Sequence, residues 1–356
     1  MALPAARPDL GLQEGYHSPQ VDVEVRLNTN ESPYPPPHAW VEALHDELDE
    51  IQFNRYPDRS ATQLRGALAE LHGVRPDQVF AANGSNEVLQ SLCLAYGGPG
   101  RTVAVFEPTY ALHSHIAHLT GTAVVGAGRR PDFSVDVDVV ADVVAGSRPA
   151  ITFLCSPNNP TGMADDAMTV RQVLGEVAES GGLMVVDEAY GQFADWSAVT
   201  MVDDDVPLVV TRTFSKTWSL AGMRLGYLVG PAGVVANLER VALPYHLDAV
   251  TQAAGRLALR HVGEMEARVG AIVAERRRLL GCLQGLSMVT WPSQANFILF
   301  RPPGGRGHDV WQALVDRSVL VRDTSSWPGL DGCLRVTVGR PEENDRFLVA
   351  LNEVMA

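Results

Sequence analysis

Lysine is almost missing from this chain. It has 356 residues, and 27 of its 28 basic residues are arginine, which leaves Lys216 as its one lysine. An arginine guanidinium stays protonated in proteins, whereas a lysine amine can lose its proton and condense with a carbonyl. A single lysine in such a chain indicates a Schiff base, although the count alone leaves a chance surface lysine equally open.

Cysteines, basic runs and long apolar runs are also scarce. The four cysteines, Cys93, Cys155, Cys282 and Cys333, lack the spacing of metal ligands, so we expect reduced thiols in a cytoplasmic protein and no metal site. No run approaches the roughly 18 apolar residues of a membrane span, and the start lacks the apolar core of a signal peptide. A net charge of -14 opposes nucleic acids and anionic membranes. Among the classes of binding partner, small molecules are therefore favoured.

Short apolar runs alternate with amphipathic segments from about residue 79 onward. Runs such as 151–155 are apolar throughout, as in strands buried on both faces of a mostly parallel sheet. We therefore predict an α/β domain over residues 41–240, with ligands at the carboxyl ends of its strands. Residues 241–356 predict a long helix over 248–283 and a smaller α+β domain. The proline-rich residues 1–40 predict an extended arm.

Two of the predicted strands are followed by polar or aromatic residues suited to a flat, phosphorylated ligand. Gly84, Ser85 and Asn86 open a helix, whose free N–H groups favour an anion, although an ordinary helix cap explains them as well. Tyr110 follows the next strand and could stack on a ring or pack in the core. Taken singly, each of these signals is weak.

Two further strands end in residues that a plain turn does not require. Asn159 lies in Ser156-Pro-Asn-Asn-Pro-Thr-Gly162, where a side-chain amide can bind a ligand oxygen. Asp187, in Asp187-Glu-Ala-Tyr190, ends a buried strand and requires a cation or several donors, such as a protonated ring nitrogen.

Several cationic or hydroxyl residues complete the set. Thr213 and Arg224 flank Lys216 and are suited to a phosphate. Arg335 lies in an apolar strand, where it would clamp a carboxylate or form a structural ion pair. The histidines at positions 113, 115 and 118 favour a polar helix face over a metal site, because no carboxylate or cysteine set accompanies them.

In order, these motifs resemble the aminotransferases of the aspartate aminotransferase fold, which are type I pyridoxal-phosphate enzymes. Leu27-Asn-Thr-Asn-Glu-Ser-Pro, Arg55-Tyr-Pro-Asp, Leu243-Pro-Tyr-His-Leu and Gly332-Cys-Leu-Arg-Val-Thr-Val-Gly are similar to the histidinol-phosphate aminotransferase family. The resemblance runs from about residue 16 to the C-terminus. It implies a large domain with a mostly parallel sheet flanked by helices, plus a smaller α+β domain.

The resemblance also implies roles around pyridoxal 5'-phosphate. Lys216 would hold the cofactor aldehyde as a Schiff base and carry a proton. Asp187 would pair with the ring nitrogen, Asn159 and Tyr190 with the ring oxygen, and Tyr110 would stack on the ring. The cofactor phosphate would be held by Gly84, Ser85, Asn86, Thr213 and Arg224.

Further residues are implied at the subunit boundary and the substrate. Tyr56 would reach the cofactor phosphate of the neighbouring subunit, so the resemblance implies a homodimer. Tyr16, Asn30, Arg322 and Arg335 occupy places linked to substrate recognition.

The reaction implied is transamination between histidinol phosphate and 2-oxoglutarate. His17 and Ser18 depart from the family pattern near the presumed substrate end. Aromatic or other amino acids therefore remain alternative donors, and decarboxylation of an amino-acid phosphate is a further alternative.

Overall fold

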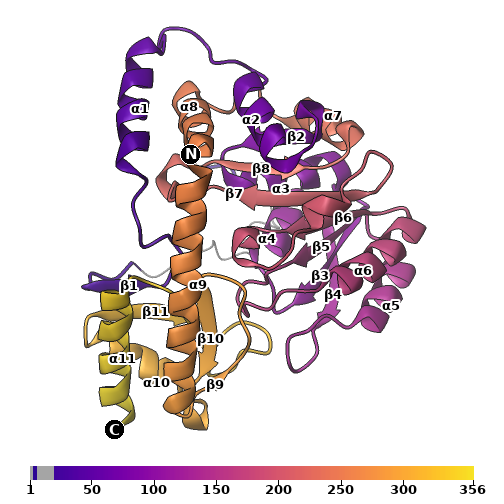
Figure 1. Cartoon of the computed structure of the whole chain (residues 1–356). Helices are drawn as coiled ribbons and strands as arrows, with labels where there is room; N and C mark the ends of the chain where they lie inside the picture. The colour runs from indigo at the N-terminus through magenta and orange to yellow at the C-terminus, as the bar shows by residue number, and fades with distance from the viewer. Residues whose placement is uncertain (1–2, 6–19) are drawn as a thin grey trace.

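The computed structural model describes residues 3–5 and 20–356 and arranges them around two β-sheets (Figure 1). The larger sheet has seven strands in the order β2-β8-β7-β6-β5-β3-β4. In that order the strands are Val79–Ala82, Gly226–Val229, Leu208–Thr213, Leu183–Asp187, Ile151–Cys155, Thr102–Glu107 and Ala123–Gly128. Strand β8 runs opposite to the other six strands of this sheet, and the pairs that do not include it are parallel. The predicted α/β fold class is confirmed.

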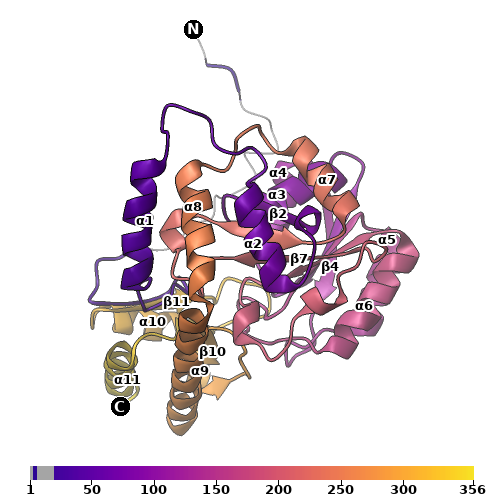
Figure 2. The ribbon, with the colours of Figure 1, turned by 45° about the horizontal axis from the view of Figure 1, so that its top comes forward.

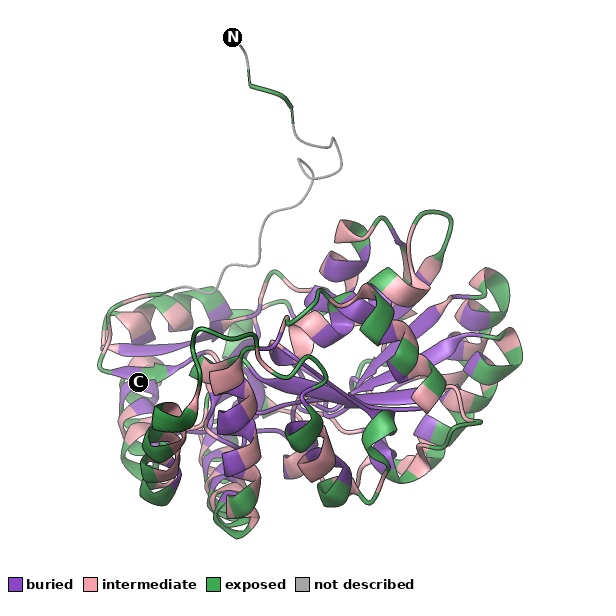
Figure 3. Cartoon of the chain, turned by 90° about the horizontal axis from the view of Figure 1, so that it is seen from above, coloured by how far each residue is buried: buried purple, intermediate pink, exposed green. Residues whose placement is uncertain are grey.

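Helices cover both faces of this large sheet, so its strands are largely buried, except for the edge strand β4, while the outer sides of the helices are exposed (Figure 3). Val185 and Val186 are neighbours in β6 but belong to different apolar clusters, because successive side chains of a strand point to opposite faces. The helices are α2 Thr62–His72, α3 Gly84–Tyr96, α4 Leu112–Leu119, α5 Val137–Ser147, α6 Ala167–Ser180 and α7 Ala232–Val241. Within the described residues, no helix is both long and apolar enough to cross a membrane.

The helix predicted over 248–283 is divided in two, so the expectation of one continuous helix is wrong. Helix α8 spans Ala249–Ala258, and α9 spans Val262–Gly285. Between them His261 leaves helical geometry, with φ -113° and ψ 35°. Figure 2 shows α8 beside α1, His38–Glu50, and the Trp40 indole donates to the Ala254 carbonyl over 3.0 Å. Helix α8 therefore packs beside the large sheet, whereas α9 continues to the second sheet.

The smaller sheet includes a strand from the N-terminal part of the chain. Its order is β1-β11-β12-β10-β9, and β1 pairs in parallel with β11. This pairing places the residues after β1, among them Thr29 and Asn30, at the cavity described below. The strands are Val25–Leu27, Val319–Asp323, Leu334–Thr337, Phe297–Arg301 and Val289–Thr290, and α10 Gly307–Val315 and α11 Pro341–Met355 pack with them.

A buried hydrogen bond links the end of α2 to the large sheet. The His72 Nε2 atom lies 2.8 Å from the hydroxyl of Tyr227, a fully buried residue of β8. Burial, reinforced by the nearby Arg212 guanidinium, lowers the pKa of His72 to about 3. The folded protein therefore keeps this imidazole neutral at pH values where the unfolded chain protonates it.

Because the pKa of His72 is lowered on folding, its contribution to stability is present above pH 6.5 and is lost as the pH falls toward 3. We expect the thermal midpoint of the unchanged protein to decline over this window more steeply than that of His72→Gln, which cannot titrate. Calorimetric scans at a series of pH values measure the difference. His38→Gln, at an exposed histidine of α1, is the matched control. Parallel declines for the unchanged protein and H72Q would contradict the assignment.

Candidate functional site

A cavity of about 370 Å³ lies at the edge of the large sheet where its parallel strands end. Strand β8 runs in the opposite direction, so Arg224, just before its start, reaches the same edge. On the side of the smaller sheet, the cavity is closed by Arg335 of β12 and by the residues that follow β1. The predicted residues that line it are Asn30, Ser85, Asn86, Tyr110, Asn159, Asp187, Tyr190, Thr213, Lys216, Arg224 and Arg335.

One end of the cavity is suited to an anion. The Arg224 guanidinium lies beside the first turn of α3, where a Cβ atom added to Gly84 would come within 2.8 Å of Arg224 Nη2. Gly84 also has φ +79°, a conformation that side chains rarely adopt. The Thr213 hydroxyl lies 3.0 Å from that of Ser215, which Arg224 also approaches. Free N–H groups, hydroxyls and a cation thus converge on one point.

A carboxylate lies in the wall of the cavity. Asp187 is buried and accepts hydrogen bonds from the Thr211 hydroxyl over 3.3 Å and the Ala189 N–H over 3.1 Å. Its second oxygen lies 3.0 Å from Nε2 of the buried His113. A buried carboxylate with these partners is held in one orientation and can face a cationic group in the cavity.

His113 is a residue whose position sequence reasoning missed. Its ring stacks on Phe153, with centroids 4.6 Å apart and planes 4° apart, and meets Tyr110 edge-on at 5.5 Å. The prediction of a polar helix face is therefore wrong for His113, although His118 is exposed. The signal available in the sequence was spacing, because His113 follows Tyr110 by one helical turn and so shares its side of the chain.

Two polar groups of the large-sheet side are held by residues from the smaller sheet and the N-terminal segment. The Asn159 Oδ1 atom accepts a hydrogen bond from the Arg335 guanidinium, which also donates to the Asn28 carbonyl over 2.9 Å. The Tyr190 hydroxyl accepts a hydrogen bond of 2.9 Å from Asn30 Nδ2. Asn159 and Tyr190 are thereby held in fixed orientations at the cavity.

The amine of Lys216 donates to the Thr29 carbonyl over 3.0 Å. Burial, together with repulsion from Arg335 and Arg224, lowers the pKa of Lys216 to about 8, while Glu31 opposes the shift. An appreciable share of these amines is neutral near physiological pH, which nucleophilic attack on a carbonyl requires.

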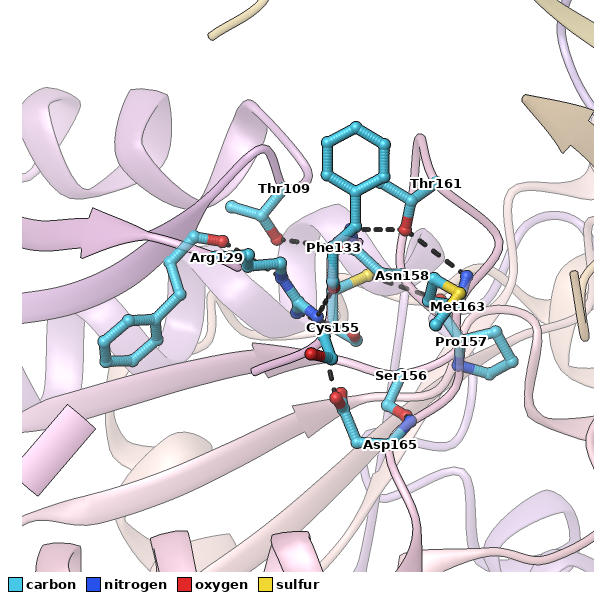
Figure 4. Close-up of polar contacts among 12 residues, drawn as sticks. Thr109, Arg129, Phe133, Cys155, Ser156, Pro157, Asn158, Thr161, Met163 and Asp165 are labelled. Carbon is cyan, nitrogen blue, oxygen red and sulfur yellow. Dashed lines mark hydrogen bonds and ion pairs between the residues drawn. The ribbon is translucent and has the colours of Figure 1, made fainter. Parts of the chain in front are cut away.

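A layer of polar contacts that includes Thr109 and Asn158 joins the loops after β3 and β5 (Figure 4). The same two loops carry Tyr110 and Asn159. The Asn158 amide donates to the Pro108 carbonyl over 2.9 Å and accepts from the Thr109 hydroxyl over 3.1 Å. These bonds fix the loop after β3 against the loop after β5.

Arg129 supports the same layer from behind. Its guanidinium donates to the Phe106 carbonyl over 3.3 Å and the Cys155 carbonyl over 3.4 Å, and lies 3.6 Å from the Asp165 carboxylate (Figure 4). Burial raises the pKa of Asp165, and the Arg129 charge opposes that rise. Sequence reasoning did not single out Arg129, because nothing local marks an arginine that pairs across two strand ends.

Two predicted site residues, Tyr56 and Arg322, do not line the cavity, and Gly84 lies at its edge beside Arg224 without being one of its lining residues. Tyr56 is 80% exposed and stacks on Tyr245, with ring centroids 4.5 Å apart. Arg322 is buried in β11 opposite Arg335, with its guanidinium 5.9 Å from the centre of the Trp327 ring. Tyr16 lies outside the described residues.

Comparison with known proteins identifies the family. The model of the family "Aminotransferase class I and II" matches residues 22–351. A histidinol-phosphate aminotransferase of Frankia casuarinae is 47% identical over 96% of this chain and 87% of its own length. One of Rhodococcus opacus is 45% identical over all of this chain and 94% of its own length.

A solved structure agrees in fold. The histidinol-phosphate aminotransferase of Sinorhizobium meliloti, solved with pyridoxal-5'-phosphate, superposes with a TM-score of 0.88 at 22% identity, covering 99% of this chain and 98% of that one. At that identity the likeness establishes the fold alone. The family match and the two relatives carry the assignment further, and the chain belongs to the class I and II aminotransferases.

Proposed function

We propose that this aminotransferase uses pyridoxal phosphate to transfer the amino group of histidinol phosphate to 2-oxoglutarate. The observation that carries the proposal is the meeting of the chain's one lysine, a buried carboxylate and an anion cradle in a single cavity. The names of the relatives at 45–47% identity support this donor. The four free cysteines support a reducing, cytoplasmic location.

The cavity residues fit this cofactor in size and charge. The space that Gly84 leaves beside Arg224, with Ser85, Asn86 and Thr213 around it, would hold the phosphate. When bound, pyridoxal phosphate supplies an aldehyde that condenses with amines and a ring that draws electrons from the substrate's α-carbon. Asp187 would face the ring nitrogen and favour its protonated form.

Other side chains would orient the ring and move the proton. Asn159 and Tyr190 would bind the ring oxygen, and Tyr110 would lie against the ring. The Lys216 Nζ atom would take the proton from the substrate carbon and return it, a role that suits an amine with a pKa of about 8. The chain's one lysine is therefore the residue whose amine lies at the cavity.

The substrate would enter beside the smaller sheet. Arg335 is buried at the cavity and would bind the carboxylate of 2-oxoglutarate or the phosphate of histidinol phosphate. Arg322 lies in the neighbouring strand and would add positive charge behind it. Asn30 lines the same side, and Tyr16 precedes it in the chain.

We also propose a homodimer in which Tyr56 reaches the partner's cavity. Tyr56 stacks on Tyr245, and two further exposed apolar side chains lie close to this pair in the sequence, Phe53 at 70% exposed and Leu243 at 76% exposed. Apolar side chains gathered on a surface mark an interaction site. Tyr56 is exposed and is not among the residues that line its own cavity, so a contribution from it requires a second copy.

The donor is tested with purified protein, added cofactor, histidinol phosphate and 2-oxoglutarate. We expect glutamate to form, with kcat/KM higher for histidinol phosphate than for phenylalanine or tyrosine. Lys216→Arg keeps the positive charge but cannot lose its proton, so turnover should fall roughly 10³-fold or more while circular dichroism is unchanged. Glutamate formation from the aromatic donors alone would refute the proposed substrate, and retained turnover in K216R would refute the role of the amine.

The lowered pKa of Lys216 predicts its reactivity toward an amine reagent. In the folded, cofactor-free protein, trinitrobenzenesulfonate should modify Lys216 with a half-maximal rate near pH 8, because only the neutral amine reacts. Mass spectrometry of the peptide that contains Lys216 follows the rate. The same peptide in urea-unfolded protein is the control and should titrate near the ordinary lysine value. Identical pH profiles in the two states would show that the fold does not shift this amine.

The shared site is tested by mixing two variants. Tyr56→Ala and Lys216→Arg should each lose most activity. When their subunits are unfolded together and refolded as mixed dimers, one site of each dimer would combine an intact Lys216 with the partner's intact tyrosine. We expect activity to reappear in the mixture. If Tyr56 instead served its own cavity, every mixed site would carry one defect, and the mixture would stay as inactive as its parents.

A further inference from the structure

Asn30 was predicted to contact substrate, but its polar atoms meet protein partners instead. The residue is buried, with 1% of its surface exposed, and has φ 57°, in the left-handed region that asparagine tolerates better than most residues. Its carbonyl accepts a hydrogen bond of 3.1 Å from Asn296 Nδ2. Its N–H and its amide oxygen both lie 3.0 Å from the Thr337 hydroxyl.

These contacts orient the side-chain amide so that the Thr337 proton also has an acceptor. The Asn30 N–H can only donate, so the Thr337 oxygen must accept from it. The one hydroxyl proton of Thr337 is then free to donate to Asn30 Oδ1. With its oxygen turned toward Thr337, the amide presents Nδ2 to the Tyr190 hydroxyl, 2.9 Å away.

The same donor-to-acceptor direction continues in the hydrogen bond to Tyr190. An amide nitrogen only donates, so the Tyr190 oxygen accepts from it, and the phenol's own proton is left to point elsewhere. Burial raises the pKa of Tyr190, so the phenol keeps that proton. Tyr190 lines the cavity, where an acceptor on a ligand can receive it.

We propose that Asn30 is a positioning residue that makes Tyr190 a hydrogen-bond donor to the ring oxygen of the cofactor. The chain of donors runs from the Asn30 backbone through Thr337 and back through the Asn30 amide. This proposal about Asn30 rests on the proposed use of pyridoxal phosphate. It assigns to Asn30 an action through Tyr190 and not a contact with substrate.

Asn30→Asp tests the direction of these hydrogen bonds with almost no change in side-chain size. The new carboxylate can only accept, so the Tyr190 proton turns toward it and the ring oxygen keeps only its contact with Asn159. We expect cofactor-free N30D to bind pyridoxal phosphate roughly ten-fold more weakly, as loss of a hydrogen bond to a charged group predicts. Titration of the visible absorbance of the bound cofactor should show its pH midpoint raised by about half a unit or more. With one hydrogen-bond donor fewer, the ring oxygen carries more negative charge, which makes the Lys216 nitrogen attached to the cofactor more basic.

A second pair of variants covers the case in which N30D does not fold. Thr337→Val removes the hydroxyl that orients the amide, so both readouts should move in the same direction by a smaller amount. Thr337→Ser restores the hydroxyl and should return the midpoint to that of the unchanged protein. Asn344→Asp is the matched control, because Asn344 is buried in α11 and bonds to Gly339 and Glu275 away from the cavity.

The outcomes distinguish a positioning role of Asn30 from a structural role. If N30D and T337V lower only the thermal midpoint, as N344D should, Asn30 has a structural role and the inference fails. If the absorbance midpoint rises in N30D and T337V but not in T337S or N344D, the directed chain is supported. If the unchanged protein binds no pyridoxal phosphate, the proposed function fails first, and that result is distinct from normal binding with an unmoved midpoint.

Discussion

In the proposed reaction the amine of Lys216 has to give up a proton, and much of the site is consistent with that requirement. Burial and two guanidinium groups, those of Arg335 and Arg224, disfavour its charged form. The Thr29 carbonyl still fixes its direction by accepting a hydrogen bond. A carboxylate placed equally close would hold the proton on nitrogen, and Asp187 is instead engaged by His113 and the Thr211 hydroxyl.

Hydrogen bonds across the cavity join the two sheets through the groups that would contact a ligand. Asn159 is bound by Arg335, Tyr190 by Asn30, and Lys216 by Thr29. In each pair one partner belongs to the large-sheet side and the other to the smaller sheet or the segment after β1. The orientation of the ligand-facing groups therefore depends on how the two parts are packed together, and the pairing of β1 with β11 contributes to that packing.

The part of the site that is best predicted from the sequence lies at the ends of short apolar stretches. Strands buried on both faces read as unbroken apolar runs, and their carboxyl ends must meet at one edge, so Ser85, Asn159 and Asp187 could be expected together. His113 was misjudged, because a histidine in an amphipathic helix has the same local pattern whether it faces solvent or a buried carboxylate. Arg129 carries no local pattern at all, since its carbonyl partners lie on two different strands.

The sequence by itself determined the chemical types available and their order: one lysine amine, a carboxylate ending an apolar strand, and a helix-opening turn suited to an anion. Charge, donors and acceptors belong to a side chain wherever it lies, so these could be read without coordinates. Only the tertiary structure decided the partners. Lys216 and Thr29 are 187 residues apart, Tyr190 and Asn30 are 160 apart, and Asn30 and Thr337 are 307 apart. Which donor meets which acceptor at such separations depends on strand register and packing, and so the direction of the hydrogen bond to Tyr190 emerged only from the fold.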